Sequence, residues 1–234
     1  QAQRLIVSGV EWRLAFKPWQ RVTKNGDVLP PTCELRLLDS AEARYVSRGG
    51  LKLEGALRDS GVVVAGLRCL DVGQSTGGFT DCLLQHGATQ VVGLDVGHDQ
   101  LHAKLRDDVR VVCVERINAR ELQADDARVP QVREGFDVVV GDVSFISLTL
   151  VLPALLPLLK QGGALLMLVK PQFELQPSNI GKGGLVKDEA SYAQVETRLR
   201  EACAALRLEV TGYWRSAIAG GDGNKEFWIG ARRA

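Results

Sequence analysis

The stretch LDVGQSTGGFT, residues 70–80 of this 234-residue chain, decides the fold. An apolar run ends in Asp71, and three glycines, a serine and a threonine follow it closely. The glycines are Gly73, Gly77 and Gly78, and the segment after them is amphipathic. An apolar run, a glycine-rich turn and an amphipathic segment predict a strand, a tight turn and a helix start. We expect a small ligand to lie against that turn.

After this stretch, short β-rich runs alternate with helical patterns to the end of the chain. Near-continuous apolar strands between helices predict an α/β fold with a mostly parallel sheet covered on both faces. The last two strands have no clear helix between them, so we expect them to pair antiparallel at one edge, as in a methyltransferase sheet. The seven predicted strands are 68–72, 90–95, 109–115, 136–142, 164–170, 208–216 and 226–231. The predicted helices are 78–85, 100–106, 148–159 and 189–206.

Residues 1–39 follow a different pattern. Residues 2–10 read as the end of a helix with a glycine stop, and an NGD turn at 25–27 between apolar positions indicates small strands. This segment is too short for a core of its own. We expect three parts: residues 1–39, a connecting segment at 40–57 and a large domain at 58–234. Because the chain opens with Gln1 and polar residues, we expect no signal peptide and further residues ahead of Gln1.

The composition is that of an ordinary globular protein, with 45% hydrophobic and 24% charged residues. The net charge is +1, so no bulk basic signal indicates a nucleic acid, although residues 1–36 carry an excess of Lys and Arg. No segment approaches the roughly 18 continuous apolar residues of a membrane span. The five cysteines form no C-x-x-C pair and the three histidines do not cluster with them. We therefore expect reduced cysteines, no metal site and a cytoplasmic protein.

The glycine turn fits neither G-x-x-x-x-G-K-[ST], because no lysine follows, nor G-x-G-x-x-G. It suits S-adenosylmethionine, since glycines let backbone approach a ligand and a helix N-terminus holds a carboxylate. Asp95 ends the second strand, close to the spacing of about 20 residues at which an acidic residue binds ribose hydroxyls. Packing alone also explains glycines at such a turn, but Asp95 and a polar residue after the third strand favour a cofactor site. The predicted cofactor residues are Asp71, Gly73, Ser75, Thr76, Gly77, Gly78, Phe79, Asp95, Val96 and Asn118.

Four charged residues point to catalysis at the same rim. VVVGDVSFISL puts Asp142 at the end of the fourth strand, and LLMLVKPQFE puts Lys170 at the end of the fifth. Open α/β sheets bind ligands at the carboxyl ends of their strands. SRGGLKLEGAL places Lys52 ahead of the first strand, and GGDGNKEFWIG places Glu226 at the start of the last. Each charge alone also fits an exposed surface position.

The chain resembles the TlyA family, often labelled hemolysin A, in motifs that occur in the family's order: YVSRGGLKLEGAL, LDVGQSTGGFTDCLLQHGA, GDVSFISL, LVKPQFE, GKGGLVKD and GNKEFW. The resemblance covers nearly the whole chain. It implies a Rossmann-like, S-adenosylmethionine-dependent methyltransferase domain of the FtsJ type. It also implies a catalytic tetrad, which falls on Lys52, Asp142, Lys170 and Glu226. Gln74 stands where relatives usually have a small residue.

The same resemblance implies substrates and partners. Residues 1–39 are similar to the second half of an S4 RNA-binding domain, residues 40–57 hold a linker and the first catalytic motif, and residues 58–234 form the FtsJ-like domain. The implied activity is methylation of cytidine 2′-hydroxyls in 16S or 23S ribosomal RNA. The expected partners are ribosomal RNA or ribosomal subunits, with neither a metal nor a membrane.

Methylating a ribose hydroxyl requires its oxygen to be aimed at the sulfonium methyl while its proton is removed. Lys170 is the candidate base or the donor that positions the hydroxyl, and we regard the positioning role as at least as well supported. Asp142 and Glu226 would then hold the two lysines.

Binding RNA also requires Lys and Arg side chains that contact its backbone phosphates. The candidates are Arg44, Arg48, Lys182 and Lys187. The glycine-rich segment 179–188 is expected to form a mobile loop over the RNA site, although a plain surface loop fits it equally well.

Three other functions compete with ribose methylation. A membrane-active hemolysin is disfavoured because the sequence has neither an apolar span nor a strongly amphipathic basic helix. An RNA-binding protein with an inactive methyltransferase fold is disfavoured by the intact tetrad and glycine turn. A base methyltransferase typically carries N/D-P-P-[YF] where this chain has DVSF.

Overall fold

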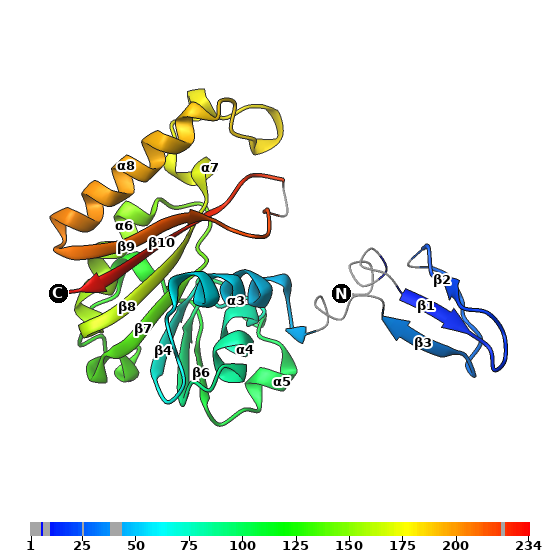
Figure 1. The fold of residues 1–234 in the computed structure, drawn as a ribbon. Coiled ribbons are helices and arrows are strands. Elements are labelled where there is room, and N and C mark those ends of the chain that lie inside the picture. The colour runs from blue at the N-terminus through cyan, green and yellow to red at the C-terminus, as the bar shows by residue number, and fades with distance from the viewer. Residues whose placement is uncertain (1–5, 7–9, 25, 38–43, 221–222) are drawn as a thin grey trace.

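The computed structural model describes residues 6, 10–24, 26–37, 44–220 and 223–234. Its main feature is a seven-stranded sheet in the order β6-β5-β4-β7-β8-β10-β9 (Figure 1). The strands are β4 (Arg68–Val72), β5 (Gln90–Leu94), β6 (Val111–Val114), β7 (Phe136–Gly141), β8 (Leu159–Val169), β9 (Leu208–Arg215) and β10 (Phe227–Arg233). The first five are parallel to one another, whereas β10 pairs antiparallel with both β8 and β9. The predicted α/β class and antiparallel edge are confirmed.

Helices cover both faces of this sheet (Figure 1). The α-helices are α3 (Arg48–Ser60), α4 (Gly78–Gln85), α5 (Ala103–Arg106), α6 (Leu148–Leu155), α7 (Pro171–Glu174) and α8 (Ala190–Ala205). Short 3-10 turns are η1 (Ala119–Glu121), η2 (Pro130–Glu134), η3 (Leu156–Leu158), η4 (Pro177–Asn179) and η5 (Lys182–Gly184). Alternate residues of β4 point to opposite faces. Cys69 packs in one core with α3 and α4, and Leu70 packs in the other with α6 and α8.

Helix α3 was not predicted, because its sequence RGGLKLEGALRDS contains three glycines. A glycine inside a helix is unfavourable by about 1 kcal/mol relative to alanine. Close packing requires at least one of them, since a Cβ on Gly50 would lie 2.3 Å from Tyr45 Cγ. The buried side chains of Leu53, Ala56 and Leu57 hold the helix against the sheet. Tertiary packing thus overrides the local preference.

Two predicted helices are shorter in the structure. The segment predicted as helix 148–159 ends its α-helical part at Leu155 and continues as η3, where Pro157 cannot extend the α-helical hydrogen bonds. The segment predicted as helix 100–106 begins only at Ala103. There His102 caps α5, with its Nδ1 accepting a hydrogen bond from the Lys104 amide at 3.2 Å.

A separate three-stranded antiparallel sheet precedes the large domain, in the order β2-β1-β3. Its strands are β1 (Val10–Arg13), β2 (Gln20–Arg21) and β3 (Glu34–Leu37), so the predicted small strands are confirmed. Two guanidinium groups contact the Trp19 ring, those of Arg13 and Arg36, at 4.5 and 4.3 Å from its centroid. The predicted helix end at residues 2–10 lies almost entirely outside the described residues, as does Asn25 of the NGD turn.

Two findings limit what the described part of the chain holds. None of its helices is long and apolar enough to cross a membrane. Among the same residues, no group of three or more His, Cys, Asp and Glu side chains is arranged to hold a metal ion.

Candidate active site

The turn between β4 and α4 depends on glycine at two positions. Gly73 has a φ of +84°, and a Cβ there would lie 2.5 Å from the carbonyl oxygen of Asp142. Gly77 has a φ of +91° and precedes α4 as its N-cap, where a Cβ would lie 2.3 Å from Leu105 Cδ1. L-residues with side chains rarely adopt such φ values. The glycines therefore let the turn lie directly against the end of β7 and against α5.

The N-termini of α3 and α4 meet beside this turn. A Cβ on Gly78 would lie 2.2 Å from Ser47 Oγ and 2.9 Å from the Gly50 amide nitrogen. Only a hydrogen at this position allows the two helices to approach so closely. This contact places Lys52, one turn into α3, at the edge of the turn.

A buried polar chain supports the turn from below. Asp71 is fully buried, and its Oδ2 accepts a hydrogen bond from Thr80 Oγ1 at 2.7 Å. Gln74 Nε2 donates to the same Thr80 oxygen at 2.9 Å. The Gln74 side chain fits only because Gly93 faces it, where a Cβ would lie 2.0 Å from Gln74 Cδ. Burial raises the pKa of Asp71 to about 7, although the Thr80 hydrogen bond opposes the rise.

The carboxylate of Asp95 shapes the other side of the turn. Its Oδ2 accepts from the Ser75 amide and its Oδ1 from the Gly97 amide, both at 2.7 Å. Ser75 has a φ of +47°, so this hydrogen bond holds a strained residue in place. Asn118 caps η1, with its Oδ1 accepting from the Arg120 amide at 3.1 Å.

These residues border two adjoining cavities. The larger, of about 350 Å³, is lined by Asp95, Val96 and Asn118 among other residues. The smaller, of about 230 Å³, is lined by Thr76, Gly78 and Phe79 and by Lys52 of α3. Gly73, Ser75 and Asp142 line both cavities. Eight of the ten predicted cofactor residues thus line these two adjoining cavities. Of the other two, Asp71 is buried in β4 and Gly77 is the N-cap of α4.

The four predicted catalytic residues form two ion pairs at the rim of the sheet. Lys170 Nζ lies 2.5 Å from Asp142 Oδ1, and Lys52 Nζ lies 2.5 Å from Glu226 Oε2. Asp142 and Lys170 directly follow the parallel strands β7 and β8. Because β10 runs antiparallel to β8, its first residues lie at the same rim, and Phe227 pairs with Val169. The topology therefore brings Glu226 to the other three.

Burial sets the electrostatics of this tetrad. Glu226 is 3% exposed, and burial raises the pKa of its carboxyl above the usual value, while the hydrogen bond and charge of Lys52 oppose that rise. Lys170 Nζ also donates to Ser144 Oγ at 2.7 Å. An ammonium carries three hydrogens, so besides these two contacts it can donate to a further oxygen.

Three residues beside the site did not stand out in the sequence. Ser144 contacts Lys170, as described above. Phe145 has a φ of +64° and is 89% exposed, with its ring 4.9 Å from that of Phe173 and its side chain at the larger cavity. Glu174 is buried and accepts from Ser147 Oγ and from the Leu148 amide, so it fixes the start of α6. Only the short spacing of Ser144 and Phe145 from Asp142 offered a signal.

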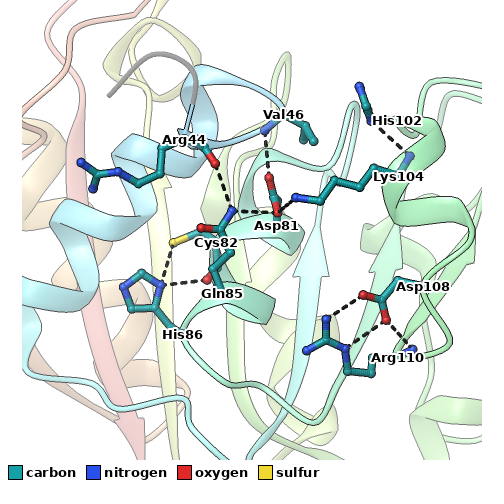
Figure 2. A network of polar contacts seen from close by, with 10 residues as sticks. All are labelled: Arg44, Val46, Asp81, Cys82, Gln85, His86, His102, Lys104, Asp108 and Arg110. Carbon is teal, nitrogen blue, oxygen red and sulfur yellow. Dashed lines mark hydrogen bonds and ion pairs between the residues drawn. The ribbon is translucent and has the colours of Figure 1, made fainter. Parts of the chain in front are cut away.

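A further network holds the chain where it enters α3 (Figure 2). The buried carboxylate of Asp81 accepts from the Val46 amide at 2.9 Å and from Gln85 Nε2 at 3.0 Å. Lys104 of the α5 segment pairs with the same carboxylate at 3.3 Å. Gln85 also donates to the carbonyl oxygen of Arg44. The segment before Lys52 is thus fastened to α4, which carries the glycine turn.

The four predicted RNA-binding residues lie in two places. Arg44 is exposed and ion-paired with Glu54, and Arg48 lines the smaller cavity. Lys182 and Lys187 are exposed in the segment 179–188, where Lys187 Nζ donates to the Ser178 carbonyl at 2.9 Å. Arg48 therefore shares the smaller cavity with Lys52, Arg44 lies on the segment before α3, and the two lysines belong to a separate loop.

The chain is similar in sequence to known methyltransferases. Residues 45–233 match the family model of FtsJ-like methyltransferases. The 16S/23S rRNA (cytidine-2′-O)-methyltransferase TlyA of Mycobacterium tuberculosis is 42% identical over 99% of this chain and 83% of its own length. Hemolysin A of Brachyspira hyodysenteriae is 36% identical over 97% of this chain and 90% of its own length.

Solved structures agree with the fold. A Streptococcus thermophilus protein described as a candidate hemolysin aligns with a TM-score of 0.81 and 38% identity, covering 100% of this chain and 82% of that one. An S-adenosylmethionine-dependent methyltransferase of Mesorhizobium loti aligns with a TM-score of 0.55 and 15% identity, covering 76% of this chain and 96% of that one. The second likeness concerns the fold alone.

Proposed function

The chain belongs to the FtsJ-like methyltransferase family, and we propose that it methylates the 2′-hydroxyl of cytidine in 16S or 23S ribosomal RNA. The methyl group comes from S-adenosylmethionine. The single observation that carries the proposal is the pair of ion pairs, Lys170 with Asp142 and Lys52 with Glu226, beside the glycine turn. The TlyA relative named for this reaction supports the choice of cytidine.

The cavity fits the cofactor by the chemistry of its lining. Asp95 offers carboxylate oxygens for ribose hydroxyls, and the larger cavity has apolar walls such as Leu94 and Ile117 for a base. Gly73 lets the turn lie against the Asp142 backbone, where a Cβ would collide with the carbonyl oxygen, and both residues line the two cavities. We assign the nucleoside end to Asp95, Val96 and Asn118, and the amino-acid end to Ser75 and Thr76. When bound, the cofactor supplies a methyl group on a sulfonium.

Lys170 acts on the oxygen that receives the methyl group. Its ammonium donates to Ser144 Oγ and is ion-paired with Asp142, and a further hydrogen of the ammonium is available to the ribose 2′-oxygen. Such a bond orients the oxygen for in-line attack, and orientation lowers the barrier by several kcal/mol in favourable cases. As the C–O bond forms and the sulfonium C–S bond breaks, the hydroxyl proton passes to water while Lys170 stays an ammonium. If Lys170 is instead the base, its ammonium first loses a proton to solvent, and the neutral amine then takes the hydroxyl proton. Lys52 and Glu226 keep the adjoining wall of the site rigid.

The substrate's size requires contacts outside the cavities. Lys and Arg side chains bind the backbone phosphates of RNA. We assign this role to Arg44, Arg48, Lys182 and Lys187. The small sheet of β1, β2 and β3 is proposed as the remnant of an S4 RNA-binding domain within residues 1–39, ahead of the segment 40–57 and the catalytic domain 58–234. The proposed partner is the ribosome or its RNA, in the cytoplasm.

The test is transfer of labelled methyl groups from S-adenosylmethionine to purified small and large ribosomal subunits by the full chain. We expect label in ribosomal RNA with the wild type and a large loss with Lys170→Ala. Cofactor binding without transfer would favour an RNA-binding protein with an inactive methyltransferase fold. Lysis of erythrocytes by the purified chain, without transfer, would favour the membrane-active function that the hemolysin name suggests.

A further inference from the structure

The segment 179–188, between η4 and α8, is folded back on itself. Ile180 and Val186 form an isolated antiparallel bridge, and the Gly181 amide donates to the Leu185 carbonyl at 2.7 Å. The Lys187 amide donates to the Asn179 carbonyl at 3.0 Å, which closes the loop at its base. We name residues 179–188 the cationic loop, because Lys182 and Lys187 lie on it.

The side chain of Asn224 binds the cationic loop from outside. Its Oδ1 accepts from the Val186 amide at 3.1 Å, and its Nδ2 donates to the Gly184 carbonyl at 2.9 Å. Asn224 is 3% exposed, whereas Val186 is half-buried and Gly184 is exposed, so both hydrogen bonds are partly shielded from water. A partly buried backbone group that loses its hydrogen-bond partner is destabilised. The two bonds therefore fix the position of the loop rather than merely touching it.

The glycines of the loop point to the same fixed shape. Gly183 and Gly184 have φ values of +75° and +79°. These left-handed conformations turn the Gly184 carbonyl into reach of Asn224. The adjacent Lys225 adds a second tie, since its Nζ pairs with Glu189 just after the loop and lies 5.5 Å from the Tyr192 ring centroid.

Asn224 stands two residues before Glu226 on the same chain segment. Glu226 is fixed in turn, because its carbonyl accepts from the Ser216 amide at 2.8 Å and its carboxylate pairs with Lys52. A short, hydrogen-bonded connection thus joins the cationic loop to the tetrad. A shift of the loop relative to Asn224 would change the distance between its lysines and the reacting centre.

We propose that Asn224 is a positioning residue that sets the cationic loop against the tetrad, so that RNA held by the loop presents its ribose to Lys170. The proposal rests on the proposed methyltransferase function. It assigns to Asn224 no contact with the reacting atoms. Its effect reaches the reaction through the placement of Lys182 and Lys187.

The experiment compares the full-length wild type with Asn224→Ala, Asn224→Asp and the control Thr89→Ala. Thr89 also donates a side-chain hydrogen bond to backbone, to the Leu67 carbonyl at 3.0 Å, but at the start of β5 and at the opposite end of the strands. For Asn224→Ala we expect KM for ribosomal subunits to rise about tenfold, as for the loss of a net hydrogen bond or two. We expect kcat to change less and the Kd for S-adenosylmethionine to stay within twofold. Asn224→Asp keeps the acceptor for the Val186 amide but turns a second oxygen toward the Gly184 carbonyl, which can only accept, so its KM for ribosomal subunits should rise at least as much as that of Asn224→Ala.

Hydrogen exchange at the Val186 amide provides the second readout. We expect it to exchange faster in Asn224→Ala than in the wild type and to be unchanged in Thr89→Ala. An unchanged KM for RNA in Asn224→Ala, or equal protection of Val186, would overturn the proposal. If the wild type itself transfers no methyl group, the proposed function fails, and exchange at Val186 still decides whether Asn224 anchors the loop.

Discussion

Lys170 Nζ lies 2.5 Å from Asp142 Oδ1, across the ends of two neighbouring parallel strands. The relationship follows from topology, since β7 and β8 end at the same rim and each is followed at once by one of these residues. The antiparallel strand β10 brings Glu226 to that rim from the other direction. Four residues far apart in the chain therefore meet beside the glycine turn.

The pair of Lys52 with Glu226 predicts an asymmetry between two substitutions. Lys52→Ala leaves a buried carboxylate without its cation, and breaking a buried pair in this way is unfavourable by about 3–5 kcal/mol. Glu226→Gln keeps an amide oxygen that can accept from Lys52 Nζ, and the Lys52 side chain is 11% exposed against 3% for Glu226, so its loss of stability should be clearly smaller. Urea unfolding of both variants measures the difference. Equal losses of unfolding free energy would contradict the account of a desolvated carboxylate.

Gly73→Ala should abolish tight cofactor binding. The alanine would be strained at a φ of +84°, and its Cβ would press on the Asp142 carbonyl. Gly66→Ala is the matched control, because Gly66 has a φ of +77° but nothing within 4 Å of a Cβ. Both should lose roughly 1–2 kcal/mol of stability through the left-handed backbone. Calorimetric titration with S-adenosylmethionine should show at least a tenfold weaker Kd for Gly73→Ala alone, and equal binding by both variants would refute the role of the close approach.

Asp95→Ala should weaken cofactor binding by about 10- to 100-fold, the range for losing hydrogen bonds to a charged group. The Ser75 and Gly97 amides lose their acceptor, so the turn loses its shape together with its contact to the ribose. Asp108→Ala is the control, since Asp108 pairs with Arg110 (Figure 2) and neither residue lines either cavity. Titration with S-adenosylhomocysteine compares the two. A wild-type Kd for Asp95→Ala would count against this site.

The buried Asp71 predicts a pH dependence of stability. Its pKa is raised to about 7 in the folded protein, above the ordinary value of 3.8, so the folded state holds a proton that the unfolded state releases between these values. Stability from this group is therefore greatest at low pH and falls as pH rises toward 7. Asp71→Asn removes that loss, so its stability relative to the wild type should increase between pH 5 and pH 8. Urea unfolding at the two pH values checks this, and a constant difference would refute it.

The glycine turn and the strand pattern were sufficient to predict the sheet, because parallel strands are apolar throughout and their turns need glycine. The same pattern predicted that Asp142 and Lys170 end neighbouring strands, and the structure pairs them. The assignment of Lys52 and Glu226 to the tetrad came from the resemblance to the TlyA family rather than from periodicity.

Other features depend on contacts that no local pattern shows. Helix α3 forms despite its glycines because Tyr45 and Phe79 occupy the space beside them. Asn224 looks like an ordinary turn residue in GGDGNKEFW, and only the folded chain shows that both ends of its amide bind the segment 179–188. Asp81 likewise holds the segment entering α3 through its contacts with the Val46 amide and Lys104, which lie far from it in the sequence (Figure 2).

In the proposed reaction, Lys170, held by Asp142 and Ser144, directs a ribose 2′-oxygen to the methyl donor. The most direct measurement is nucleoside analysis by mass spectrometry of ribosomal subunits treated with the wild type and with Lys170→Met, after cofactor binding by both has been confirmed. We expect 2′-O-methylcytidine with the wild type and a loss of at least a hundredfold with the variant, at an unchanged cofactor Kd. A methyl group on a base, or undiminished 2′-O-methylcytidine with Lys170→Met, would contradict the account.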